Sequence, residues 1–519
     1  MTSFDAIVVG GGHNGIVAAT VLAKAGRRVV LLEADEQLGG PARTEEFAPG
    51  FRVSLAHILN RLHPEVVKAL DLEANGLTFD TTDMPSIALS ANGEPLVLTG
   101  AYGEGLSGAQ PSEVQAWSEL RAQLIRYAGI LKPMLARRPP DLSGMTLGET
   151  SALGMVGLSL RRLGKEDMRD FLRMFLMNVA DVADDCLTDD RLKGLLAFDA
   201  VMGSHLGPRS PTSLLGLYYR LAGEVAGKAG AQTMPRGGMG AVINAMASAA
   251  NKAGVQVRTN APVARINVQD GRVAGVVLTS GEEFSAPIVL AATNPSTALM
   301  ELTGPRNFDT GFVRKVANIR MNGSVAKLHL ALNGLPKFNG VSEQDLRGRL
   351  VLAPSTNHVE RAFNPSKYGG FSAEPVMEIV MPSIADASLA PAGGCVLSAN
   401  IMFAPYALKE GWTKGKAKLL KAVMAQLESV APGIGKLVRH AELLTPLDIE
   451  QRYRMPGGHW HHGELQADQM LMSRPVSGWS GYDTPVEGLY LASAGSHPGG
   501  GISGVPGLNA ARRVLARKG

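Results

Sequence analysis

The chain has 519 residues, of which 45% are hydrophobic and 19% charged. This length and composition predict a folded protein of more than one domain and exclude a disordered chain. The 51 Lys and Arg residues exceed the 47 Asp and Glu residues by only four, so the charge does not indicate a nucleic-acid partner. The two cysteines, Cys186 and Cys395, form no CxxC pair, which argues against a disulfide framework, a dithiol redox centre or a cysteine-based zinc site.

The first residues lead directly into an apolar strand, without a basic segment or a cleavable apolar segment before it. Uninterrupted apolar runs fall short of the roughly 20 residues that a membrane-spanning helix needs. We therefore expect a cytoplasmic protein, with peripheral membrane association left open.

The segment from residue 4 to residue 34 predicts a βαβ unit. Ala6–Val9 is a short buried strand, residues 16–26 form a helix, and residues 27–34 form a second strand. The helix carries several alanines, as expected where a helix packs closely on a sheet. This arrangement is typical of the first half of a dinucleotide-binding fold.

The turn between this first strand and the helix contains Gly10, Gly12 and Gly15 in the pattern GxGxxG. Gly10 permits a tight turn, Gly12 lets a pyrophosphate approach the backbone, and Gly15 allows close packing of helix and strand. Glu33 lies 18 positions after Gly15, close to the position of the acidic residue that binds a ribose. The helix N-terminus would offer N–H groups to the phosphates. The segment therefore predicts a dinucleotide site.

A second glycine turn, Gly39-Gly40, follows Glu33 and precedes Arg43 and Thr44. FAD extends beyond the adenosine half that a βαβ unit holds, and a second turn with an arginine suits its pyrophosphate and flavin ring. NAD-dependent dehydrogenases do not need such a turn. The cofactor predicted from these residues is FAD.

The central part of the chain alternates between helical and strand patterns. Residues 105–230 have mainly helical periodicity. A glycine turn at Gly237, Gly238 and Gly240 then begins a helix, and strand patterns follow, with Val263 where a strand would pass the adenine. Residues 300–450 predict a mostly antiparallel sheet with attached helices.

The end of the chain repeats the order of the beginning. Residues 488–501 predict a strand that runs into a glycine-rich turn, and a helix follows. A second helix start beside the first would direct backbone N–H groups to the N1/O2 edge of a flavin, where charge develops during reduction.

We therefore predict an α/β fold with a discontinuous Rossmann-type FAD-binding domain and a mixed sheet-and-helix substrate domain. Residues 1–75, 231–300 and 451–519 would form the FAD-binding domain. Residues 76–230 and 301–450 would form the substrate domain.

Several segments resemble the phytoene desaturase and carotenoid isomerase family of flavoproteins. The C-terminal "LYLASAGSHPGGGISGVPGLNAA", the central "MPRGGMGAVINAMASAANKAGVQV" and the N-terminal glycine pattern are similar to those of the family. "GSVAKLHLALNGLPKF" and "PGGHWHHGELQADQMLMSRP" look closer to the phytoene dehydrogenase-like branch that includes pyridine nucleotide-disulphide oxidoreductase domain-containing protein 2. The resemblance covers nearly the whole chain. The chain nevertheless lacks the CxxC and the second complete nucleotide fingerprint that a disulphide reductase needs.

The resemblance implies a two-domain flavoprotein with non-covalent FAD and a tunnel for a long apolar substrate. Some members of the family bind membranes peripherally. By position, it implies FAD contacts at Gly10, Gly12, Gly15, Glu33, Gly40, Arg43, Val263, Gly495, Gly501 and Ile502. To these we add the neighbouring residues Gly39, Thr44, Ser496 and Gly500.

The most unusual polar cluster is "GGHWHHGE", which contains His459, His461, His462 and Glu464. Its spacing does not match a zinc motif, and we predict no metal site. His462 and Glu464 are the candidate general acid and base, whereas hydrogen-bonded structural histidines are the alternative.

The sequence therefore predicts an FAD-dependent oxidoreductase that desaturates, saturates or isomerises a long apolar substrate of isoprenoid or fatty-acid type. A flavin amine oxidase and a non-catalytic FAD-holding interaction protein are the alternatives. The expected partner is a hydrophobic small molecule or lipid, without nucleic acid. The sequence makes no prediction of the oligomeric state or the electron acceptor.

Overall fold

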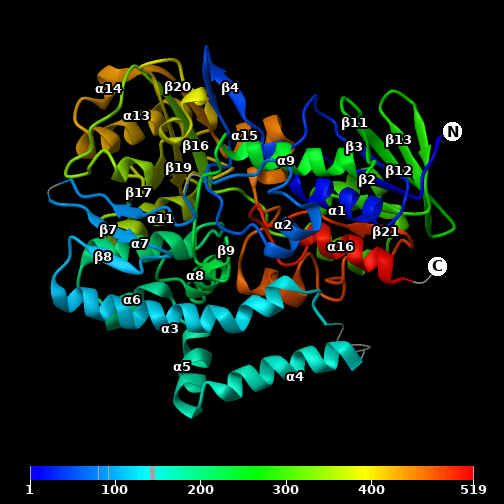
Figure 1. The fold of residues 1–519 in the computed structure, drawn as a ribbon, viewed down its shortest axis with the longest axis horizontal. Helices are drawn as coiled ribbons and strands as arrows, with labels where there is room; N and C mark the ends of the chain where they lie inside the picture. The colour runs from blue at the N-terminus through cyan, green and yellow to red at the C-terminus, as the bar shows by residue number, and fades with distance from the viewer. Residues whose placement is uncertain (1, 80, 92, 141–146, 518–519) are drawn as a thin grey trace.

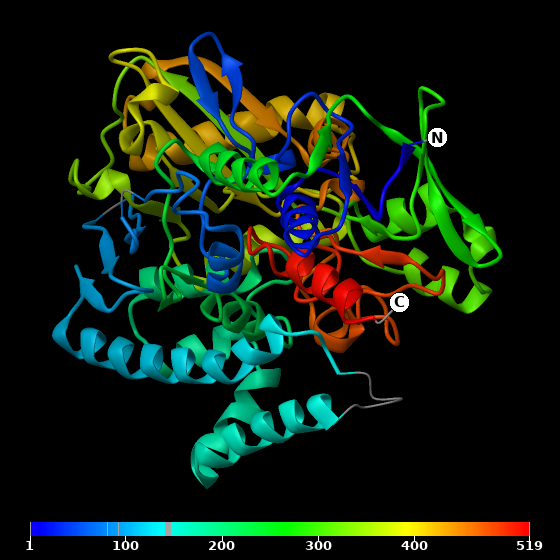
Figure 2. The same cartoon turned by 45° about the vertical axis from the view of Figure 1, so that its right-hand side comes forward.

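The computed structural model describes residues 2–79, 81–91, 93–140 and 147–517. A parallel sheet and a larger mixed sheet lie side by side, and a layer of helices runs along one side of the larger sheet (Figures 1 and 2). The chain passes between the two sheets several times. Both described termini lie near the parallel sheet (Figure 1).

The parallel sheet has five strands that come from three distant parts of the chain. Their order is β11 (Gln256–Arg258), β3 (Val29–Leu32), β2 (Ala6–Val9), β15 (Val289–Ala291) and β21 (Leu489–Leu491). All neighbouring strands in it are parallel. The four strands other than β11 are entirely buried, which matches their unbroken apolar sequences.

The two faces of the parallel sheet are covered differently because alternate residues of each strand point to opposite faces. On one face, the strands pack against α1 (His13–Lys24), α9 (Met239–Lys252) and α16 (Val505–Ala516). On the other face lies a four-stranded sheet, so the region has three layers. The order of that sheet is β1 (Thr2–Ser3), β14 (Glu283–Ser285), β13 (Arg272–Leu278) and β12 (Val263–Gln269).

The first helix begins three residues earlier than the sequence pattern predicted. Gly12 is the N-cap of α1, and the helix runs from His13 to Lys24 instead of over 16–26. Gly15 therefore lies inside the first turn. The hydrophobic pattern alone placed the helix start too late because His13, Asn14 and Gly15 are not hydrophobic.

The larger sheet has eight strands, and the only parallel pair among its neighbours is β6 with β17. This confirms the mostly antiparallel sheet predicted for residues 300–450. Three further strands from residues 86–107, which the sequence analysis did not predict, extend it. The order is β20 (Val438–Leu444), β16 (Val325–Leu332), β19 (Cys395–Met402), β18 (Met377–Val380), β17 (Arg349–Leu352), β6 (Ser86–Ala88), β7 (Leu96–Thr99) and β8 (Gly105–Ser107).

Helices cover both faces of the larger sheet. On one face, α3 (Pro111–Ala136), α7 (Asp190–Val201) and α8 (Leu214–Leu221) form a large core with the sheet. On the other face lies α13 (Trp412–Val430). The remaining bounds are α2 (Pro64–Leu70), α6 (Val179–Cys186), α10 (Thr310–Ala317), α11 (Thr356–Phe363), α12 (Pro382–Ala385), α14 (Ile434–Leu437), α15 (Pro446–Tyr453), β4 (Glu45–Ala48), β5 (Phe51–Val53), β9 (Glu224–Val225) and β10 (Lys228–Ala229).

Two helices, α4 (Leu147–Arg162) and α5 (Lys165–Leu176), project from the body of the protein in both views (Figures 1 and 2). They carry four of the exposed large hydrophobic side chains, namely Met155, Leu158, Leu172 and Leu176. No helix within the described ranges is long and apolar enough to cross a membrane.

The last helix packs closely against the first helix. A Cβ atom on Gly507 of α16 would lie 2.0 Å from the carbonyl oxygen of Asn14 in α1. A Cβ atom on Gly15 would lie 2.0 Å from the carbonyl oxygen of Gly10. Real Cβ atoms do not approach backbone this closely, so glycine is required at both positions.

We expect Gly507→Ala to destabilise the protein by about 1–3 kcal/mol, because the new methyl group forces two helix backbones apart. The measurement is the midpoint of thermal unfolding. Gly129→Ala is the matched control, because Gly129 is an exposed residue of α3 with no atom within 4 Å of the added methyl group. The control is expected to be neutral or slightly stabilising, since alanine favours helix. An unchanged midpoint for Gly507→Ala would contradict the packing argument.

Candidate functional site

A cavity of about 500 Å³ lies at the carboxyl ends of the parallel strands. Gly10 and Gly12 line it after β2, residues 32–35 at the end of β3, residues 292–294 after β15, and Ala494 beyond β21. Loops at this edge of a parallel sheet are the usual position of a dinucleotide site. The cavity therefore lies where the sequence predicted a dinucleotide.

The first glycine loop leaves space for a ligand. Gly10 has a φ of +103°, which a residue with a side chain adopts only at a cost. Gly12 has no atom within 4 Å of the position that a Cβ atom would occupy. Because Gly12 also caps α1, the free N–H groups and the positive end of the helix dipole face the same region. A phosphate would be stabilised there.

Four buried polar atoms of residues that line this cavity have no hydrogen-bond partner among the described residues. They are His13 Nε2, Asn14 Oδ1, Thr293 Oγ1 and His462 Nδ1. A buried polar group without a partner costs about 1–3 kcal/mol, so these atoms indicate a polar ligand. The cavity therefore fits the FAD that the sequence predicts.

Glu33 and Val263 lie where the adenosine half was predicted. Both line the cavity, and Val263 begins β12. The carboxylate of Glu33 accepts hydrogen bonds from Gly11 N at 2.6 Å and from Asp35 N at 2.9 Å. These bonds fix the carboxylate at the end of β3.

The residues of the second glycine turn are divided between the cavity and its surroundings. Gly40 lines the cavity, whereas Gly39 has a φ of +114° and lies against Ile243. Arg43 and Thr44 do not line it. Arg43 pairs with Asp35 and Glu45, both at 2.6 Å. Thr44 bonds to the Ser54 hydroxyl at 3.1 Å and accepts from Gly240 N at 3.2 Å.

The C-terminal glycine turn reaches a second cavity that adjoins the first. Gly501 and Ile502 line this second cavity. The other predicted residues of the turn do not line either cavity: Gly495 packs on Pro295, Gly500 on His461, and Ser496 is buried. His13 and Gly501 both line this second cavity, so the two ends of the chain meet at this point.

The predicted catalytic pair is separated in the structure. His462 lines the first cavity, and burial lowers its pKa to about 3, so its ring is uncharged at neutral pH. Glu464 lines neither cavity and instead accepts a hydrogen bond from Gln466 and lies 3.8 Å from Arg320. Burial raises the pKa of Glu464. In the described part of the chain, no group of three or more His, Cys, Asp or Glu residues is arranged to hold a metal ion.

We call the second cavity the inner chamber; its volume is about 180 Å³. It shares His13, Pro41, Trp460 and Ala494 with the first cavity, so the two adjoin. One part of its wall is apolar. The apolar residues are Pro41, Ala42, Leu55, Ala56, Ile58 and Met202.

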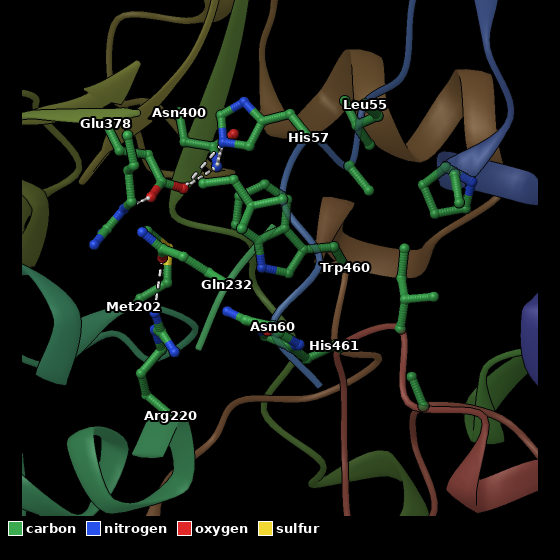
Figure 3. Close-up of a pocket in the computed structure, with 18 of the residues that line it drawn as sticks. Leu55, His57, Asn60, Met202, Arg220, Gln232, Glu378, Asn400, Trp460 and His461 are labelled. Carbon is green, nitrogen blue, oxygen red and sulfur yellow. Dashed lines mark hydrogen bonds and ion pairs between the residues drawn. The ribbon is translucent and has the colours of Figure 1, made fainter. Parts of the chain in front are cut away.

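A cluster of charged side chains occupies another part of this wall, and Figure 3 shows Glu378, Asn400 and His57 close together there. Arg349 Nε donates to Glu378 Oε2 at 2.6 Å, and Arg349 Nη2 donates to Asp199 Oδ1 at 2.5 Å. Arg349 is only 3% exposed. Burial alone would raise the pKa of Glu378, but the charge of Arg349 and the hydrogen bond with His57 hold it well below its usual range.

The register of the larger sheet aligns two further members of the cluster, Lys327 and Asn400, with Glu378. Lys327 is opposite Asn400, and Asn400 is opposite Glu378. Lys327 is completely buried; its Nζ lies 2.7 Å from His57 Nδ1 and donates to Asn400 Oδ1 at 2.9 Å. Burial lowers the pKa of Lys327 well below its usual value and that of His57 to about 4. His57 is therefore uncharged at neutral pH.

The sequence analysis did not predict this cluster. The available signal was a charged residue within an apolar strand, such as Lys327 in "SVAKLHLAL" or Glu378 in "VMEIVM". Charged residues are seldom fully buried unless they are paired. The sequence could have identified each residue separately as a buried charge, but it did not reveal which partners these residues contact.

Comparison with known proteins agrees with the fold and the first cavity. The chain matches the family described as flavin containing amine oxidoreductase over residues 15–515. It is 32% identical to pyridine nucleotide-disulfide oxidoreductase domain-containing protein 2 of Rattus norvegicus, over 99% of this chain and 93% of the rat protein. It is 23% identical to the phytoene desaturase (neurosporene-forming) of Rhodobacter capsulatus, over 97% and 92% of the two chains. The solved structure of cyclohexylamine oxidase from Brevibacterium oxydans superimposes with a TM-score of 0.58 at 15% identity, over 99% and 98% of the chains.

These similarities confirm the resemblance, the α/β fold and the FAD cofactor predicted from the sequence. The family match covers almost the entire chain, and the relatives are covered along nearly their full length. The chain belongs to the flavin containing amine oxidoreductase family and is an FAD-dependent oxidoreductase.

Proposed function

We propose that this oxidoreductase desaturates, saturates or isomerises a lipid-like substrate of isoprenoid or fatty-acid type in the inner chamber. The apolar wall formed by Ala42, Leu55, Ala56, Ile58 and Met202 carries the proposal, because it would hold a hydrocarbon segment beside the cofactor cavity. The phytoene desaturase relative supports the same class of substrate.

The protein's part in such a reaction is mainly to bind and position. Bound FAD supplies the two-electron chemistry. Trp460 and His13 lie where the cavity meets the chamber and would orient the reacting segment. His462 is uncharged at neutral pH because burial lowers its pKa to about 3. The lowered pKa therefore favours a role for His462 as a neutral hydrogen-bonding group over a role as a cationic acid.

The amine oxidase alternative has less support from the chamber. Two carboxylates, Asp199 and Glu378, line it, but both are already paired with Arg349. An amine would have to compete with the guanidinium group for them. The non-catalytic alternative predicts a bound FAD that no added compound reduces, reoxidises or needs. Adding lipids and an amine to the FAD-loaded protein separates this alternative from the proposal.

We expect Gly12→Leu to abolish FAD binding without unfolding the protein. The backbone of Gly12, with φ of −67°, accepts a side chain, and that side chain would occupy cavity space. The measurement is the flavin absorption of the purified protein, with circular dichroism as the test of folding. Gly129→Leu on the exposed side of α3 is the control and should keep its flavin. Retention of flavin by folded Gly12→Leu would show that the cofactor lies elsewhere.

The substrate class is tested with the FAD-loaded protein under anaerobic conditions. Oleate, squalene and cyclohexylamine are added separately to oxidised and to dithionite-reduced protein. Flavin absorption and product mass spectra are recorded. We expect a lipid either to change the redox state of the flavin or to be converted to an isomer, and the amine to do neither.

If cyclohexylamine bleached the flavin and neither oleate nor squalene did, the result would support the amine oxidase alternative against our proposal. Intact flavin that none of the compounds reduces, reoxidises or uses would support the non-catalytic alternative.

A further inference from the structure

We infer that Arg220 and Arg349 form a carboxylate-binding subsite in the inner chamber, so that the substrate is a lipid-like carboxylic acid. The inference rests on the proposed function and narrows its substrate class. Neither arginine lines the first cavity. The subsite is therefore separate from the residues that would hold the cofactor.

Arg349 has a donor that the protein leaves unused. Its Nε and Nη2 are paired with Glu378 and Asp199, but its buried Nη1 has no hydrogen-bond partner in the part of the chain that the structure describes. An unused donor on a buried cation is costly. A ligand that brings an acceptor into the chamber would remove this cost.

Arg220 is a second cation on the same wall, and among the described residues it has no carboxylate within ion-pair distance. It donates to the Gly230 carbonyl oxygen at 3.1 Å and to Gln232 Oε1 at 2.7 Å, and both acceptors are neutral. Figure 3 shows Arg220 and Gln232 directed together toward the chamber. Burial lowers the pKa of Arg220; the charge of Asp199 opposes this shift, and the charge of Arg349 adds to it. An anion near both guanidinium groups would offset this destabilisation.

The acceptors of the cluster, in contrast, are already occupied. Asp199 accepts from Arg349 and from the Tyr102 hydroxyl at 3.1 Å. Glu378 accepts from Arg349 and from Asn400 Nδ2 at 2.6 Å, and His57 Nε2 lies 3.1 Å from it. Among the charged groups of the wall, the buried atom without a partner in the described residues is thus a donor, Arg349 Nη1. This balance favours an anionic group over an ammonium group.

A carboxylate suits this position better than a larger anion. Guanidinium groups bind planar carboxylates with two parallel hydrogen bonds. The chamber holds about 180 Å³, which leaves little room for a tetrahedral dianion next to a hydrocarbon segment. With the carboxylate at the arginines, the adjoining carbon atoms would lie along the apolar wall.

The test compares ligands of equal chain length on the FAD-loaded protein. Dodecanoate, dodecanol and dodecyl phosphate are titrated by isothermal calorimetry, which requires no turnover. We expect dodecanoate to bind about 10- to 100-fold more tightly than dodecanol, as charge-assisted hydrogen bonds of about 1.5–3 kcal/mol imply. Equal affinities, or tighter binding of dodecyl phosphate, would overturn the inference.

Variants test whether the preference for dodecanoate comes from the arginines in the wall of the inner chamber. Arg220→Gln should weaken dodecanoate about tenfold or more and leave dodecanol unchanged, whereas Arg220→Lys should keep part of the preference. Arg121→Gln is the matched control, because Arg121 is also partly buried and bonds to the carbonyl oxygens of Ala101 and Tyr102 outside the chamber. An equal loss of dodecanoate affinity in Arg121→Gln and Arg220→Gln would contradict the inference that Arg220 belongs to a specific subsite. If Arg220→Gln fails to fold, the comparison of dodecanoate, dodecanol and dodecyl phosphate on the unmodified protein still tests the inference.

The two proposals fail in different ways. Tight binding of dodecanoate with no conversion of any lipid would overturn the proposed function and retain the subsite. Conversion of squalene by a protein that binds dodecanoate no better than dodecanol would retain the proposed function and overturn the subsite.

Discussion

The close approach of α16 to α1 is the constraint on which the functional site depends. Gly507 allows the backbone of α16 to lie against the backbone of Asn14, and Gly504 lies against the side chains of Val66 and Val17. This contact brings the C-terminal turn beside the first glycine loop, where His13 and Gly501 line the same cavity. The glycines near the end of the chain therefore serve mainly to allow close helix packing and to leave space around the cavities. A side chain at any of these contacts would separate the two halves of the site.

The second notable feature is the concentration of charge inside the larger sheet. Burying Arg349, Glu378 and Asp199 carries a desolvation cost that their mutual attraction recovers only in part. Apolar residues of similar volume would often give equal or greater stability. The fold therefore does not need these charges for its stability. Because they line the inner chamber, which adjoins the cofactor cavity, recognition of a ligand is the role that we infer for them.

The parts of the site that could be predicted from sequence are those set by local spacing. Gly10, Gly12 and Glu33 lie within one βαβ unit, so their separation along the chain determines their separation in space. The buried cluster could not be predicted in this way. Lys327, Asn400 and Glu378 meet only through the register of three strands, and residues 86–107 gave no clear strand pattern although they complete the same sheet. The position of Glu464 outside both cavities likewise involves a tertiary contact, with Arg320, besides its local hydrogen bond with Gln466.

The order of strands in the parallel sheet also affects how the protein is made. β2 leaves the ribosome first, but its neighbour β15 follows near the middle of the chain, and β21 and α16 come last. At about 5–20 residues per second, synthesis of the whole chain takes about 25–100 seconds. During that time the first glycine loop lacks the turn that completes the cofactor site. The cofactor site can therefore be completed only after the last segment of the chain has been made, and a nascent chain that stops before residue 500 would leave the N-terminal unit without its closing partner.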